Sequence, residues 1–242
     1  MKVIRPNCRV QFTSEDIDFI TKVLSPEGQQ DCLTKLLTDE ESRDLILDDS
    51  KLFHAVLEAR GCLSISSHFY FYVLVRRIFV DMGIKEREVA DYVAEMLSEF
   101  SRTDRGQCDS PNACGQLEYF FEMMEALRSA DDRNAFLIRA HIGNHSLFLS
   151  GIFLQRLKHR AETKGFPDLR YYEALGQANF HAASSHRLAE RYHLGHVFST
   201  LADRFHATRL ALNQLTERLF SMSEFDQAAD LLLRKNCPKI GI

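Results

Sequence analysis

The sequence predicts an all-α protein, a multi-helix bundle of about ten helices, and three observations lead to that prediction. Apolar residues recur at helical spacing along most of the chain. Five prolines and eleven glycines are few for 242 residues, as expected where most residues are helical. Strict alternation of apolar and polar residues between turn signals is missing, apart from a weak alternation over Cys8–Phe12.

The clearest helical pattern lies near the C-terminus. Apolar residues and one threonine follow one another there at steps of four and three: Leu194, Phe198, Leu201, Phe205, Thr208, Leu212, Leu215 and Leu219. This spacing keeps one face apolar along a helix of about seven turns. We therefore expect long C-terminal helices that pack side by side.

In the N-terminal half, local signals divide the chain into successive helices. Thr13 and Asp16 have the spacing of a capping box, in which each side chain accepts a hydrogen bond from the other residue's backbone N–H. Thr38 and Glu41 repeat that spacing, and Ser66-Ser67 precede a run rich in Phe and Tyr. The first predicted helix opens at Thr13-Ser14 and is stopped by Pro26 and Gly28. The next are Gln30–Leu37, Thr38–Leu47, a helix marked by Leu52, Phe53, Val56 and Leu57 and ended by Gly61, Ser66–Gly83 and Lys85–Phe100.

Local signals divide the C-terminal half of the chain into successive helices as well. Gly143-Asn144 is interpreted as a turn between two helices, and Ser184-Ser185 and Gly195 are candidate breaks in a long helical stretch. Ser223 with Asp226 is expected to cap a last helix. The predicted helices are Leu117–Arg128, Asp132–His141, Asn144 or Ser146 to Thr163, Leu169–Ser184, a long helix up to Phe220, and Ser223–Lys235.

Residues 101–114 (SRTDRGQCDSPNAC) combine Gly, Pro, Asn, Asp and Ser with almost no apolar side chain, which predicts a long loop. The chain is accordingly divided into an N-terminal helical half (1–100), this loop (101–114) and a C-terminal helical bundle (115–242). We expect the two halves to share one core. Cys108 and Cys114 lie in the loop, too far apart in sequence for the usual zinc spacing.

Composition limits the classes of partner and compartment. The net charge of -4 and pI of about 6.2 give no overall attraction to nucleic acid or anionic membranes. The most apolar stretch, His68–Val80, is too short to span a bilayer and is interrupted by Arg76-Arg77. Six scattered cysteines and an N-terminus without a signal-peptide pattern favour a cytoplasmic protein with reduced thiols. We expect no nucleic-acid and no membrane partner.

One cluster of residues has the spacing of a metal site. His186, Glu190 and His193 fall at steps of four and three, which would place two imidazoles and a carboxylate on one helical face. Glu-x-x-His is half of the motif by which helical bundles hold iron or manganese, and zinc accepts the same ligands. Glu118 or Glu122 of another helix could add carboxylates, but a second Glu-x-x-His is missing. The alternative is that the three residues only flank the apolar stripe, with their polar tips in water.

Two other patterns are interpreted as structural. His141 and His145 are four residues apart, but the turn expected at Gly143-Asn144 would separate them. The small pair Ser150-Gly151 lies in an apolar helical run, where it would allow two helices to approach closely.

Residues 143–153 (GNHSLFLSGIF) resemble a G-D-x-A-L-F-x-S-G-x-F signature, and Tyr171-Tyr172 with Gly176 and Ala178 resemble its Y-Y-x-x-x-G-x-x-A continuation. These patterns are similar to those of a family of uncharacterised bacterial all-helical proteins, over roughly residues 130–220. The chain departs from the pattern at Asn144, His145, Phe180 and His181. The resemblance implies a cytoplasmic, all-helical bacterial protein and carries no activity, cofactor or site residues.

These observations favour a non-enzymatic binding or interaction module that acts through its surface or forms a homodimer through a helix face. On that hypothesis the protein needs no cofactor. The alternative is a metal-dependent, oxidase-like helical-bundle enzyme that holds iron, manganese or zinc through His186, Glu190 and His193. A third hypothesis places an apolar ligand under the aromatic helix at 68–80. Whether the chain is an enzyme, and its oligomeric state, stay open at this level.

Overall fold

The computed structural model describes residues 3–25, 30–58, 65–102, 116–164 and 167–221, and within these ranges the regular structure is entirely helical. One 3-10 turn, η1 (Arg9–Gln11), stands where the sequence showed a weak alternation. The α-helices are α1 (Ser14–Leu24), α2 (Gln30–Leu36), α3 (Glu40–Leu47), α4 (Ser50–Glu58), α5 (Ser67–Asp81), α6 (Arg87–Arg102), α7 (Gln116–Ser129), α8 (Asp132–Ile152), α9 (Leu154–Lys164), α10 (Leu169–Ser184), α11 (Arg187–Arg191), α12 (Gly195–Asp203) and α13 (Phe205–Ser221). The all-α, multi-helix prediction is confirmed.

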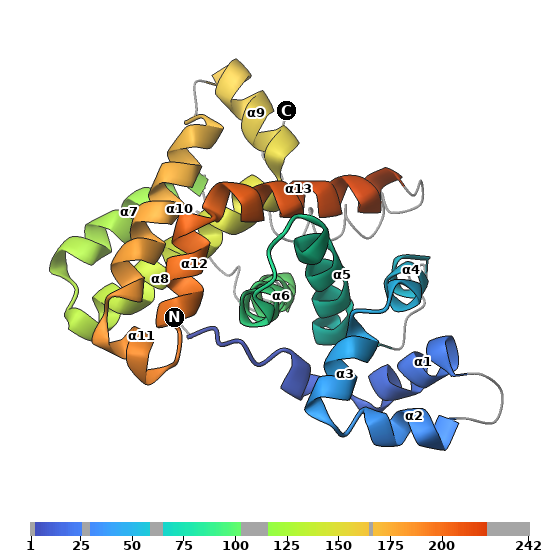
Figure 1. Ribbon diagram of the computed structural model, residues 1–242. Coiled ribbons are helices and arrows are strands. Elements are labelled where there is room, and N and C mark those ends of the chain that lie inside the picture. Colours follow the sequence, from blue (N-terminus) through green and yellow to red (C-terminus); the bar gives the residue numbers. More distant parts are fainter. Residues whose placement is uncertain (1–2, 26–29, 59–64, 103–115, 165–166, 222–242) are drawn as a thin grey trace.

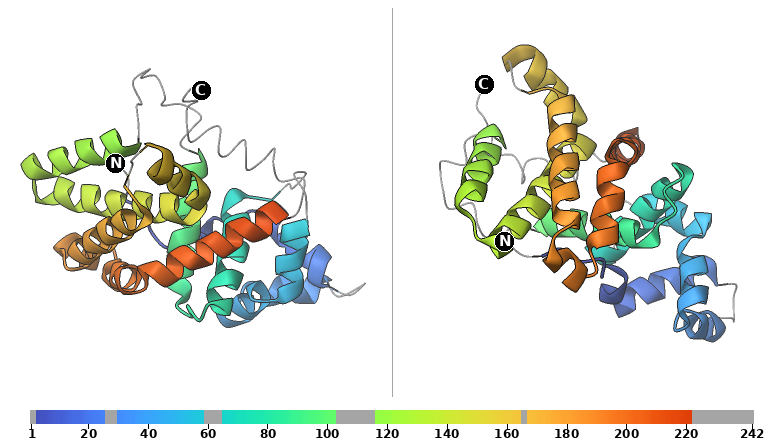
Figure 2. Two further views of the ribbon diagram at one scale, coloured as in Figure 1. Left: turned by 90° about the horizontal axis from the view of Figure 1, so that it is seen from above. Right: turned by 60° about the vertical axis from the view of Figure 1, so that its left-hand side comes forward.

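Helix α13 joins the two halves of the molecule. It lies across the fold and packs on α8 of the C-terminal half and on α5 of the N-terminal half (Figure 1). Helix α10 packs against both α8 and α12, and α5 packs against α6. Figure 2 shows α7 beside α8 at one end of the molecule, with α1–α4 gathered at the other. Buried apolar side chains from both halves form one contiguous cluster, and Leu33 of α2 packs against it while partly exposed.

Helix starts follow the local signals closely. Thr13 and Asp16 form the predicted capping box, and Ser66 caps α5 by accepting the backbone N–H of Phe69. The cap of α3 is Asp39 rather than Thr38, because the Asp39 carboxylate accepts the backbone N–H of Ser42. Helix α6 continues to Arg102, two residues into the predicted loop. Gly61, the rest of that loop with Cys108 and Cys114, and the predicted helix at 223–235 lie outside the described residues.

The long C-terminal helix proves to be two helices. The stripe from Leu194 to Leu215 is buried as predicted, but the chain leaves the helix at Arg204, with φ -109° and ψ 22°. Before the break α12 packs on α10 and α6, and after it α13 packs on α8 and α5. The apolar spacing runs through the break unchanged, so the periodicity could not reveal it.

The predicted turn at Gly143-Asn144 is wrong, because α8 passes through it without interruption. Gly143 is required by packing: a Cβ there would lie 2.7 Å from the ring of Phe180. Asn144 is buried and accepts a hydrogen bond from the Tyr92 hydroxyl at 2.8 Å. Glycine followed by asparagine is typical of a turn in sequence. Here the glycine allows a close helix contact and the asparagine forms a buried hydrogen bond, so the same two residue types serve the interior of a helix.

Close approach explains the Ser150-Gly151 pair as well. A Cβ on Gly151 would stand 2.8 Å from the side chain of Leu212 on α13. The Asn213 amide donates to the backbone carbonyls of Ser150 and Gly151 at 2.9 and 2.6 Å. The small pair therefore lets α13 contact the backbone of α8, as the sequence predicted.

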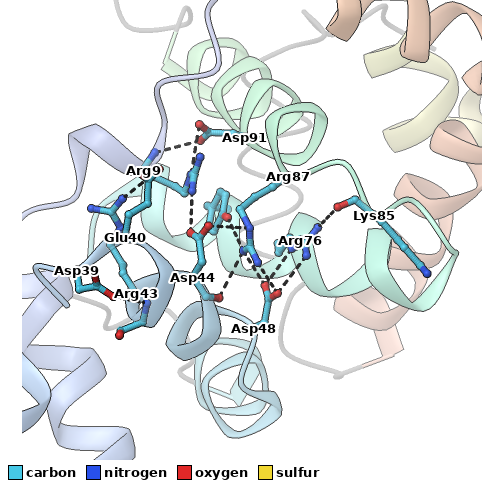
Figure 3. A network of polar contacts seen from close by, with 12 residues as sticks. Arg9, Asp39, Glu40, Arg43, Asp44, Asp48, Arg76, Lys85, Arg87 and Asp91 are labelled. Carbon is cyan, nitrogen blue, oxygen red and sulfur yellow. Dashed lines mark hydrogen bonds and ion pairs between the residues drawn. The ribbon is translucent and has the colours of Figure 1, made fainter. Parts of the chain in front are cut away.

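A network of ion pairs fixes the N-terminal segment (residues 3–12, which include η1) and α3 against α5 and α6 (Figure 3). Asp48 accepts two hydrogen bonds from Arg76, at 2.9 and 3.1 Å, and two from Arg87, at 3.0 and 2.7 Å. Arg9 donates from Nη1 to Asp44 at 2.7 Å, and its backbone N–H donates to Asp91 at 3.1 Å. Paired guanidinium–carboxylate bonds of this kind are among the stronger polar contacts.

None of the helices in the described ranges combines the length and the hydrophobicity that a bilayer-spanning segment needs.

Asp48→Asn tests the network. Burial raises the pKa of Asp48, but the hydrogen bonds and charges of Arg76 and Arg87 lower it more, so it lies below its ordinary value. The carboxylate therefore stabilises the fold at neutral pH, and that contribution is lost as pH falls from about 4 through the folded-state pKa. We expect Asp48→Asn to lower the free energy of unfolding by about 2 kcal/mol at pH 7.

The control is Glu40→Gln, whose partner Arg43 stands 4.0 Å away and whose side chain is 76% exposed. It should change stability by less than about 0.5 kcal/mol. Urea unfolding measures both variants. Equal effects from the two substitutions would contradict a structural role for the network.

Candidate ligand cavity

The three sequence-predicted metal ligands do not lie on one helix, because the chain leaves the helix on both sides of α11. His186 is the N-cap of α11: its Nδ1 accepts the backbone N–H of Leu188 at 3.1 Å. Its Nε2 lies 2.9 Å from Asp132 of α8, and its ring stacks on Phe136 at 5.1 Å. His186 therefore holds α11 against α8.

His193 and Glu190 belong to the other end of α11, and both are exposed. The N–H of Leu194 donates to the carbonyl of Ala189 and that of His193 to Glu190, which is a Schellman motif with His193 at its left-handed position, φ 56°. The common face that the spacing predicted is thus absent. Among the described residues no group of three or more His, Cys, Asp or Glu is arranged to hold a metal ion. On α7, Glu122 is exposed, and the side chain of Glu118 lies outside the described part.

The structure instead points to a cavity between the N-terminal segment, α6, α8 and α11. Its volume is about 480 Å³. Four separate stretches of chain contribute side chains to it: Val3, Ile4, Arg5, Asn7, Gln11, Glu95, Glu99, Arg133, Leu137, Leu188 and Tyr192. Clefts and cavities of roughly 300–1,000 Å³ with a few convergent polar groups are typical of small-molecule sites.

Carboxylates of α6 form one side of the cavity. Glu95 is 5% exposed and accepts a hydrogen bond from the side-chain amide of Gln11 at 2.9 Å. The imidazole of His68 lies 3.4 Å from the same Glu95 oxygen. Glu99, one turn further along α6, is half-buried and also lines the cavity. This side of the site is therefore acidic, and at Glu95 it is shielded from water.

Asp91, one turn before Glu95, links the cavity to the ion-pair network. Burial raises the pKa of Asp91 to about 6, although the charge and hydrogen bonds of Arg9 act in the opposite direction. The Cys8 thiol is fully buried nearby and donates to the carbonyl of His68 at 3.2 Å. Burial, together with Asp91 and Glu95, raises the pKa of this thiol, so it stays protonated at neutral pH and acts as a packing group.

Basic side chains lie at the exposed part of the lining. Arg5 and Arg133 are both exposed, and the Arg5 guanidinium lies over the ring of Tyr192 at 4.7 Å from its centre. Tyr192 and Leu188 are brought to the cavity by α11, and Leu137 by α8. The His186 cap and the His193 turn thus position one wall of the cavity.

The sequence interpretation missed the acidic row on α6. Asp91, Glu95 and Glu99 recur at steps of four, which places them on one helical face. A charged row on a helix beside apolar residues usually faces water, and only the tertiary structure covers it with the N-terminal segment. The spacing of these three carboxylates could be read from the sequence, but their burial could not.

His141 and His145 are also brought together, contrary to the predicted turn between them. Their rings stack at 5.9 Å on consecutive turns of α8, beside Phe100. Burial lowers the pKa of His141 to about 4 and that of His145 to about 3. Both imidazoles are therefore neutral near pH 7 and pack as half-buried aromatic rings against Phe100.

The chain matches no protein-family model, no curated protein and no solved structure.

Asp91→Asn tests the electrostatics beside the cavity. A raised pKa means that the fold favours the protonated carboxyl, so this contribution to stability is present at low pH and is lost as pH rises through about 6. Asparagine imitates the protonated form at every pH. The stability of Asp91→Asn relative to the natural chain should therefore improve between about pH 4 and about pH 6 and change little above that. A difference that does not vary with pH, measured by urea unfolding, would refute the raised pKa.

His193→Gly tests the turn that ends α11. Gly83, at φ 76°, ends α5 with the same pair of backbone hydrogen bonds, from Gly83 to Val80 and from Ile84 to Phe79. Because side chains disfavour the left-handed conformation, His193→Gly should raise the free energy of unfolding by about 0.5–1 kcal/mol. Gly83→His is the matched reverse and should lower it by about 1 kcal/mol. Loss of stability in His193→Gly would show that its imidazole makes a contact worth more than the strain.

Proposed function

We propose that the protein is a non-enzymatic binding module and that its ligand is a small polar molecule held in the cavity between the N-terminal segment, α6, α8 and α11. One observation carries the proposal: opposite charges from three separate segments, Arg5 of the N-terminal segment, Glu95 and Glu99 of α6 and Arg133 of α8, converge on a half-open cavity of about 480 Å³. Convergence of this kind on a cavity is the usual mark of a ligand site.

The lining suits recognition of a ligand that has both polar and apolar parts. Asn7 and Gln11 supply side-chain amides, and Tyr192 supplies an aromatic face. Ile4, Leu137 and Leu188 supply apolar surface. An apolar wall gives affinity through burial, while a few fixed polar groups set the orientation of the ligand.

Its walls are also held in place before any ligand arrives. Arg9 ties the N-terminal segment to Asp44 and Asp91, and His186 ties α11 to α8. A pre-formed site loses less entropy on binding than one that must be assembled.

A thermal-shift screen of small polar metabolites tests the proposal. A ligand present at about a hundred times its Kd should raise Tm by roughly 5 °C for a chain of this size. Leu137→Phe adds volume to the half-buried Leu137 wall and should abolish the shift while leaving the fold intact.

The control is Met124→Phe, an enlargement at a position of α7 that is 39% exposed and outside the cavity. It should preserve the shift. A screen without stabilising compounds, or a shift that survives Leu137→Phe unchanged, would contradict binding at this site.

A further inference from the structure

We infer that the ligand of this cavity is a zwitterion, with its ammonium group beside Glu95 and Glu99, its carboxylate beside Arg5 and Arg133, and an apolar body between them. The inference rests on the proposed function, since it assigns a ligand class to the same cavity. It also gives the ligand a direction: the positive end enters first.

The direction follows from a gradient of burial across the charged lining. Glu95 is 5% exposed, Glu99 is half-buried, and Arg5 and Arg133 are exposed. A cation inside therefore meets carboxylates where water is scarce, and an anion at the mouth meets guanidinium groups that water already reaches. Charge pairs are stronger in the less polar interior, so the ammonium–carboxylate contact should contribute more affinity than the contact at the mouth.

The balance of charge argues against ligands with a single charge. The lining carries two carboxylates and two guanidinium groups, so its formal charge is neutral. A ligand anion driven to the buried end would meet Glu95, and a ligand cation at the mouth would meet Arg5 or Arg133. Like charges brought together in this way are unfavourable, and only a ligand with both charges satisfies both ends.

The surroundings of Glu95 make a buried cation the favoured neighbour. Asp91 stands one turn away on the same helix, and burial already raises the pKa of its carboxyl. Arg9 faces Asp91, whereas Gln11 and His68 face Glu95. An ammonium group placed beside Glu95 would also lie near Asp91, and its charge would favour the ionised form of the Asp91 carboxyl, which burial disfavours.

Apolar side chains separate the two charged ends. Ile4, Leu137 and Leu188 line the cavity together with the ring of Tyr192. A ligand with adjacent charges and a polar body would leave this surface uncovered. An ω-amino acid or a short peptide carries its ammonium and carboxylate at opposite ends of such a body, and about 480 Å³ accommodates either.

Three compounds with the same six-carbon chain separate the alternatives by calorimetry on the intact chain: ε-aminocaproic acid, which carries both charges, hexylamine and hexanoic acid. We expect the zwitterion to bind at least about ten-fold more tightly than either half. If hexylamine bound as tightly as ε-aminocaproic acid, the inference would be overturned, because the arginines at the mouth would then contribute no affinity. If none of the three binds but the metabolite screen yields a ligand, the inference fails while the proposed function stands. If both experiments are negative, both fail.

Two exposed or half-buried positions assign the contacts. Arg133→Gln should weaken binding of ε-aminocaproic acid by about ten-fold and leave hexylamine unaffected, since only the zwitterion reaches the guanidinium. Glu99→Gln should weaken both. Arg128→Gln on α7 and Glu88→Gln on α6, both exposed and outside the cavity, are the matched controls and should change neither affinity. Equal losses in Arg133→Gln for the two compounds would overturn the assigned orientation.

Discussion

Asp48 and its two arginines form the constraint on which the rest of this structure depends. The N-terminal segment has no sheet to join and only one short turn of helix, so its position comes from side-chain contacts. Asp48 fixes Arg76 and Arg87, Arg87 also pairs with Asp44 at 3.0 Å, and Asp44 in turn holds Arg9. Each carboxylate has more than one partner, which offsets the cost of removing it from water. These ion pairs together hold the N-terminal segment in place, and that segment forms one wall of the cavity.

Helix α11 supplies the opposite wall by a different means. It has five residues and is too short to be stable alone, so its two ends are fixed by contacts beyond the helix itself. His186 caps the first end and reaches Asp132, and the left-handed turn at His193 closes the second. Residues that spacing suggested as metal ligands thus position Leu188 and Tyr192. The same polar residue types serve helix ends and metal sites, and only the backbone conformation distinguishes them.

Features of this fold that local chemistry decides could be predicted from the sequence, and features that distant contacts decide could not. The starts of α1 and α5 were predictable because a cap involves residues three positions apart. The break at Arg204 and the continuity of α8 through Gly143 were not, since both depend on which helices pack there. The predicted metal site required one continuous helix through His186, Glu190 and His193. The cavity is instead assembled from four separate segments, and their sequences share no period that could reveal it.

The buried row on α6 shows why the cavity needs a separate explanation from the fold. Asp91 has a structural partner in Arg9, which ties the N-terminal segment down. Glu95 accepts a hydrogen bond from Gln11, the last residue of η1, and lies 3.4 Å from the imidazole of His68. An apolar residue at position 95 would bury surface without the desolvation cost of a carboxylate. In the proposed orientation, a cationic group bound beside Glu95 would offset part of the cost of burying this carboxylate.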